Sequence, residues 1–100
     1  MPRPIKNRIV GFNPEITYFK PRGVPVLSLE EVCLTVEELE SIRLSDHLDL
    51  PYDEAGKRMG VSRATFGRII QHARKVIADA LTKGKAIKVE GGHFTLTDTP

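Results

Sequence analysis

Several residue types are scarce in this 100-residue sequence, and each scarcity excludes a class of protein. The single cysteine, Cys33, excludes an internal disulfide framework and suits the reducing cytoplasm, where we expect the protein to act. The absence of tryptophan and the presence of only two tyrosines argue against an aromatic platform for single-stranded nucleic acid. No apolar run is long enough to span a membrane or to form a signal peptide, so we expect no membrane partner.

Catalytic and metal-binding patterns are also missing. The histidines His47, His72 and His93 do not combine with Cys33 in any ligand spacing of a zinc site. No phosphate-cradling glycine loop and no nucleophile motif occurs. Adjacent carboxylates, such as those at 37–38, are explained by the favourable charge of acids at helix starts. We therefore expect a protein that is not an enzyme and that holds no metal and no cofactor.

The formal net charge of +2 is the average of three blocks of opposite sign. Residues 1–23 hold five basic residues and one acid, residues 24–54 hold one basic residue and nine acids, and residues 55–100 hold nine basic residues and three acids. Blocks of this kind suggest two surfaces with different partners. The alternative is that the blocks fold against each other and form ion pairs at the surface.

Start signals predict the first helix. A capping box formed by its first residues predicts a helix over 35–47. Val36, Leu39 and Ile42 share its inward stripe, which Leu44 fits poorly. This predicted helix carries four of the nine acids of the acidic block, and Glu37, Glu38 and Glu40 are its candidate partner-docking residues.

Proline, serine and glycine residues predict where two further helices begin and end. Pro51 suits the first position of a helix and Gly60 can take the left-handed conformation that ends one, which predicts a second helix between them. Ser62 caps a third helix that runs to about Lys83, where Gly84 can end it. One apolar stripe of this third helix is expected to be core: Phe66, Ile69, Ile70, Ala73, Val76, Ile77 and Ala80.

Extended segments surround the helices. Short strands are expected near 8–10, 17–19 and 32–34, and alternation on both sides of Gly91 and Gly92 predicts a C-terminal β-hairpin. The expected fold is mainly α: a three-helix unit with an extended basic N-terminal arm, short strands and the hairpin. We expect one compact domain in which residues 1–34 form the arm and short extended segments, residues 35–84 the helical core, and residues 85–100 the hairpin and tail.

The segment 52–71, YDEAGKRMGVSRATFGRIIQ, has the spacing of a helix-turn-helix. Ala55 and Gly56 provide small residues where two helices cross, and Gly60 provides the turn. The apolar anchors from both helices are Met59, Val61, Phe66 and Ile69. The same spacing also occurs by chance in helical bundles.

The other face of the third helix has the chemistry of a DNA reader. Arg68 and Gln71 match guanine and adenine edges, and small residues at 64 and 67 would let the helix approach the bases closely. The predicted base-reading residues are Arg63, Ala64, Gly67, Arg68 and Gln71. The predicted phosphate-binding residues are Ser62, Thr65, Arg74 and Lys75, with Arg3, Lys6 and Arg8 of the N-terminal arm. The alternatives are a solvated basic face and a solvated tail.

The predicted hairpin has three possible roles. It could bring Lys85 and Lys88 to phosphates as a wing, close the core, or pair with a second subunit.

The sequence resembles an uncharacterised family of small prokaryotic predicted DNA-binding proteins whose helix-turn-helix is similar to region four of sigma factors. The resemblance covers almost the whole chain and is carried by MPRP, EITYFKPRGVPV, LTVEELESIRL, MGVSRATFGRII and GKAIKVEGG. It implies a sequence-reading helix that starts at Ser62. In two positions the chain departs from the family: Gly56 replaces an alanine, which would loosen the second helix, and Ala64 replaces a larger polar residue, which weakens base reading there.

We therefore expect sequence-specific binding of double-stranded DNA and a role as a transcriptional regulator. A homodimer is expected because one short recognition helix reads few bases and symmetric dimers double the site. The competing hypothesis is a protein-interaction module that docks on the transcription machinery through the acidic surface of residues 30–54.

Overall fold

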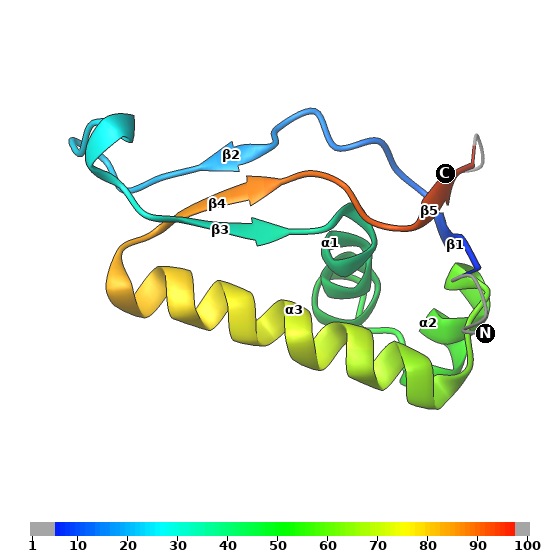
Figure 1. Ribbon diagram of the computed structural model, residues 1–100. Coiled ribbons are helices and arrows are strands. Elements are labelled where there is room, and N and C mark those ends of the chain that lie inside the picture. The colour runs from blue at the N-terminus through cyan, green and yellow to red at the C-terminus, as the bar shows by residue number, and fades with distance from the viewer. Residues whose placement is uncertain (1–5, 98–100) are drawn as a thin grey trace, which may run out of the picture.

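The computed structural model describes residues 6–97, which form three α-helices and five short strands (Figure 1). The strands are β1 (Arg8–Val10), β2 (Tyr18–Phe19), β3 (Glu31–Leu34), β4 (Ala86–Val89) and β5 (Phe94–Leu96). The helices are α1 (Val36–Ile42), α2 (Tyr52–Met59) and α3 (Arg63–Lys83), with a 3-10 turn at Val26–Ser28 and a π-helical turn at Arg43–His47. The architecture is α/β, so the expectation of a mainly α fold was too narrow. None of the described helices is long and apolar enough to cross a membrane.

The strands form two small sheets, and the predicted C-terminal hairpin is wrong. In one sheet β4 lies between β2, which is antiparallel to it, and β3, which is parallel. In the other sheet β5 pairs in parallel with β1, from the opposite end of the described chain. Between β4 and β5, Gly91 and Gly92 both have positive φ, and the Gly91 carbonyl accepts a hydrogen bond from Val36 N. The glycines therefore carry the chain past the start of α1 and into a second sheet.

The first helix begins as predicted but ends differently. The capping box is present, since Thr35 Oγ1 accepts from Glu38 N at 3.2 Å and Glu38 Oε1 accepts from Thr35 N at 2.9 Å. Regular α-helix stops at Ile42, and the following five residues form the π-helical turn. A π turn holds more residues than an α turn and changes the direction of the side chains after it. Leu44, which did not fit the α-helical stripe, is for this reason fully buried.

The glycine and serine signals for α2 and α3 are confirmed, whereas Pro51, expected at the first helical position, is the extended N-cap residue before Tyr52. Gly60 ends α2 with φ 72°, and Gly84 ends α3 with φ 66°. Ser62 caps α3, because its side chain accepts from Thr65 N at 3.1 Å. The predicted inward stripe of α3 is buried or packed against the core along its whole length.

Two apolar clusters hold the elements together. One lies between the helices and is formed by Leu44, Ala55, Met59, Phe66 and Ile70. The other joins the strands to α1 and α3 and is formed by Val10, Leu34, Val36, Ala73 and Val89. Helix α3 contributes to both clusters, so its inner side is fixed and its outer side is presented to solvent.

Candidate nucleic-acid interface

Helices α2 and α3 are joined by a tight turn whose packing depends on Gly56. A Cβ on Gly56 would lie 2.9 Å from the carbonyl oxygen of Val61, which is too close for a backbone atom. The glycine was expected to loosen α2, but it is buried and lets the turn approach the helix. Across the same junction the rings of Tyr52 and Phe66 meet edge to face, with centroids 5.2 Å apart. The two helices are therefore held in one fixed orientation.

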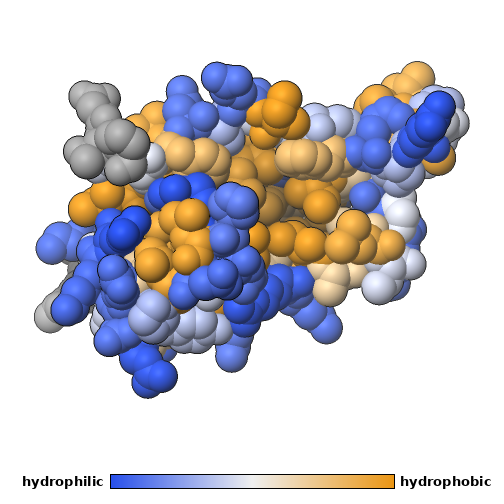
Figure 2. Space-filling model, turned by 180° about the vertical axis from the view of Figure 1, so that it is seen from behind, coloured by the Kyte–Doolittle hydropathy of each residue, from blue (hydrophilic) through white to orange (hydrophobic). Residues whose placement is uncertain are grey.

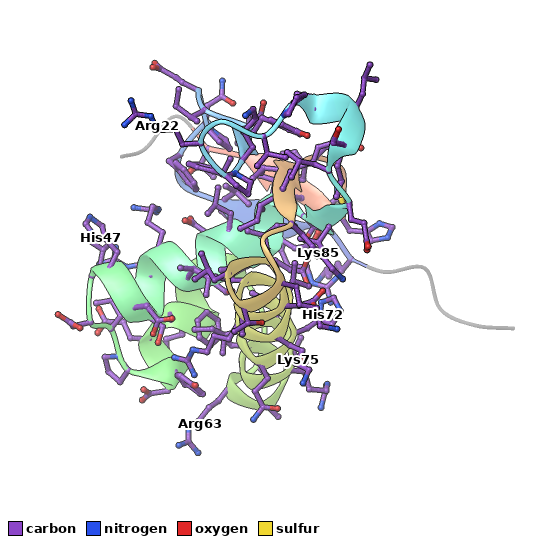
Figure 3. The ribbon with its side chains drawn as sticks, turned by 90° about the vertical axis from the view of Figure 1, so that its left-hand side faces the viewer. Arg22, His47, Arg63, His72, Lys75 and Lys85 are labelled. Carbon is purple, nitrogen blue, oxygen red and sulfur yellow. The ribbon has the colours of Figure 1, made fainter. Side chains whose placement is uncertain are left out.

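The outer side of α3 presents most of the predicted base-reading residues together. Arg63, Ala64, Arg68 and Gln71 are all exposed, and they lie in the first half of the helix. Arg68 Nη2 donates to Thr65 Oγ1 at 3.1 Å, one turn earlier. Neither Arg63 nor Arg68 forms an ion pair with any residue between 6 and 97. Figure 3 shows Arg63 extending away from the body of the molecule at the start of α3.

Gly67 does not lie in the centre of that exposed side. It is half-buried next to Tyr52, and a Cβ there would be 3.8 Å from the Tyr52 ring, which is an ordinary van der Waals distance. The position of Gly67 therefore does not support the expectation that this glycine opens space for close approach to DNA. The small residue at the centre of the outer side is Ala64.

Some of the predicted phosphate-binding residues already bind other side chains of the protein, and others do not. Arg74 donates to both carboxylate oxygens of Asp46, at 2.7 and 3.1 Å, and to the Tyr52 hydroxyl at 3.0 Å. The hydrogen bonds to Asp46 raise the pKa of Arg74 above its ordinary value. Ser62 and Thr65 are joined to each other in the cap of α3. Lys75 is exposed on the helix surface and forms no salt bridge with the described residues.

The N-terminal arm is partly folded into the domain. Arg8 lies in β1 and pairs with Glu37 at 3.4 Å, so it is not available as the free phosphate ligand that was expected. Lys6 is exposed, and Arg3 lies outside the described residues. A Cβ on Gly60 would lie 3.5 Å from Ile9 Cδ1, which places the arm beside the turn between α2 and α3. The arm therefore enters the domain next to the start of α3.

The three glutamates expected on a docking surface are buried. Glu37 accepts from His93 N and pairs with Arg8, and Glu38 contacts His72 Nδ1 in addition to capping α1. Glu40 has a side chain only 2% exposed. It accepts from Gly11 N at 2.6 Å and pairs with Arg43. A buried carboxylate needs such partners. The acidic surface expected over residues 30–54 therefore lacks these carboxylates, because they hold the arm and α3 against α1.

Two basic residues near the turn were missed. Lys57 and Arg58 are exposed in the last turn of α2, where Arg58 is 3.9 Å from Glu54. The sequence feature that could have identified them is their place in the basic block of residues 55–100. No group of three or more His, Cys, Asp or Glu side chains that could hold a metal ion occurs within residues 6–97.

Comparisons with known proteins identify relatives along almost the entire chain. Residues 1–97 match the family described as "Protein of unknown function DUF134". A "UPF0251 protein" of Desulfosudis oleivorans is 56% identical over 97 residues, covering 97% of this chain and 70% of the relative. Another from Caldanaerobacter subterraneus subsp. tengcongensis is 60% identical over 94 residues, covering 94% of this chain and 80% of the relative. No solved structure matches. The chain belongs to the DUF134 family, whose relatives carry the name UPF0251.

Proposed function

We propose that this protein binds double-stranded DNA sequence-specifically and acts as a transcriptional regulator, with α2 and α3 as a helix-turn-helix similar to region four of sigma factors. The observation that carries the proposal is the outer side of α3. There Arg63, Arg68 and Gln71 are exposed together around the small Ala64, and the two arginines have no acidic partner among the described residues. Exposed cations without partners suit phosphates, and arginine with glutamine suits base edges in the major groove.

The roles within this surface follow from position. Arg68 and Gln71 read base edges, and Lys75, farther along the helix, contacts phosphate. Lys57 and Arg58 extend the basic surface from α3 to the end of α2. In a helix-turn-helix the helix before the recognition helix crosses the DNA backbone, which gives these two residues a phosphate-binding role. Lys6 enters from the arm that lies beside the turn.

The test is selection of duplexes from a random pool, followed by polarisation titration of the selected sequence and a scrambled one. Affinity should fall steeply as salt rises, because phosphate contacts release counterions. Arg68→Ala should weaken the selected duplex by about 1–3 kcal/mol and the scrambled one much less, whereas Lys75→Ala should weaken both alike. Arg22→Ala is the matched control, since Arg22 is exposed on the opposite side of the molecule from Arg63 (Figure 3). Absence of duplex binding at low salt would refute the proposal.

A further inference from the structure

Helix α3 is much longer than the two helices, α1 and α2, that pack against it. α3 has 21 residues, whereas α1 has seven and α2 has eight. Beyond them α3 continues beneath the three-stranded sheet, as Figure 1 shows. One helix does not cover a three-stranded sheet completely. A groove of about 320 Å³ is left beside the helix, lined by Phe19, Pro21, Ala80, Leu81, Lys85 and Ile87.

This groove is apolar, and its walls are exposed. Leu81 is 75% exposed and Phe19 is 48% exposed. Figure 2 shows apolar surface gathered between the sheet and this part of α3. Exposed apolar side chains that line a groove are typical of interaction sites. The patch holds both a protruding leucine and a hollow, which is what a self-complementary contact requires.

The rim of the groove carries little net charge. Lys20 Nζ donates to the carbonyl oxygens of Pro21 and Val24, at 3.0 and 2.7 Å. Lys85 Nζ donates to Asp79 at 2.9 Å. Lys85 is thus paired with an acid of the chain, whereas Lys20, which also lines the groove, is held by backbone carbonyls and keeps its charge. A second copy, whose rim also has only Lys20 unpaired among its lysines, would meet little repulsion there.

The position of the groove suits a second copy for a further reason, which rests on the proposed function. Leu81 lies 13 residues beyond Arg68, which is about 20 Å along a helix axis. A two-fold axis near Leu81 would separate the two reading surfaces by up to roughly 40 Å. Half-sites one helical turn of DNA apart are separated by about 34 Å, which lies within this reach. We propose that this groove binds a second copy of the chain, with Leu81 of each protomer in the groove of the other.

Sedimentation equilibrium over a wide range of protein concentration, without DNA, tests the interface. The wild-type protein should change with concentration from 11.2 kDa to twice that mass. Leu81→Glu should stay at 11.2 kDa, because it places a charge in an apolar contact. Leu27→Glu is the matched control, since Leu27 is 100% exposed at the 3-10 turn, and this variant should still dimerise. A monomeric wild type, or a Leu81→Glu variant that dimerises like wild type, would overturn the proposal.

A crosslinking experiment covers the case in which Leu81→Glu unfolds. In a Cys33→Ser background, Leu81→Cys should form a disulfide-linked dimer on oxidation, and Leu27→Cys should not. Equal crosslinking of the two would overturn the proposal. Because neither experiment contains DNA, a dimer that binds no duplex would refute only the proposed function. DNA binding by a protein that stays monomeric would refute only this interface.

Discussion

Two glycines in the helices of the candidate interface should respond in opposite ways to alanine. Gly67 in α3 and Gly56 in α2 both occupy helical positions, where alanine is favoured over glycine by about 1 kcal/mol. Their surroundings differ. At position 67 the new Cβ would lie 3.8 Å from the Tyr52 ring, and at position 56 it would lie 2.9 Å from the carbonyl oxygen of Val61.

The expected free energies follow from these distances. Gly67→Ala gains the helical preference without a clash, so the free energy of unfolding should rise by about 0.5–1 kcal/mol. Gly56→Ala gains the same preference, but Val61 belongs to the turn, and a backbone atom must move to admit the methyl group. Overpacking of this kind costs about 1–3 kcal/mol, so Gly56→Ala should lower the free energy of unfolding by up to about 2 kcal/mol.

Thermal unfolding followed by circular dichroism measures both effects. For a domain of this size 1 kcal/mol corresponds to about 4–8 °C in Tm, so the two variants should move in opposite directions from wild type by several degrees. If Gly56→Ala were as stabilising as Gly67→Ala, the tight contact between α2 and the turn would be refuted.

The Gly67→Ala variant also separates two explanations of the glycine. The position of Gly67 beside Tyr52 predicts that the more stable variant binds its selected duplex as wild type does. A variant that is more stable but has lost affinity for DNA would show that the glycine is needed for close approach of α3. In that case the assignment of close approach to Ala64 would be wrong.

Three other results are expected. Arg74→Ala should lower Tm more than Lys75→Ala does, because Arg74 bonds Asp46 and Tyr52, whereas Lys75→Ala should reduce duplex affinity at unchanged Tm. Glu40→Ala should lower the free energy of unfolding by about 2–4 kcal/mol in urea titrations, because it leaves a backbone amide and Arg43 without their buried partner. The hydrogen bond to Glu31 raises the pKa of Tyr18, so the stability it gives is present below the ordinary tyrosine pKa and is lost as pH rises through the folded value. Spectrophotometric titration should show this tyrosine ionising at lower pH in Glu31→Gln, and no change in that variant would contradict the assignment.

Local signals were enough to predict three helices and most of their ends. The capping box at Thr35, the serine cap at position 62 and the two left-handed glycines each act through hydrogen bonds or dihedral angles within one turn. Leu44 could not be placed from the sequence, because its burial depends on the π-helical turn that breaks the α period after Ile42. The periodicity used to assign the stripe assumed one regular helix.

Strand partners were not predictable in the same way. Alternation indicates which side chains of a strand share a face, but it does not identify the neighbouring strand. β4 and β5 are close in sequence and were expected to pair, yet each finds its partner more than fifty residues away. The loop between the two strands instead forms hydrogen bonds with the start of α1, since Gly91 O accepts from Val36 N and His93 N donates to Glu37.

The charge blocks of the sequence did not show that many acids and basic residues pair with each other. Several basic residues outside the exposed side of α3 already have acidic partners, including Arg8, Arg43 and Arg74. With acids of the central block, Arg8 joins the arm to α1 and Arg74 joins α3 to the π-helical turn, while Arg43 pairs within one helical turn. Arg63 and Arg68 are left without acidic partners among the described residues, and they lie within two turns of each other. The positive surface is therefore narrower than the sequence count implied, and it coincides with the part of α3 proposed to read DNA.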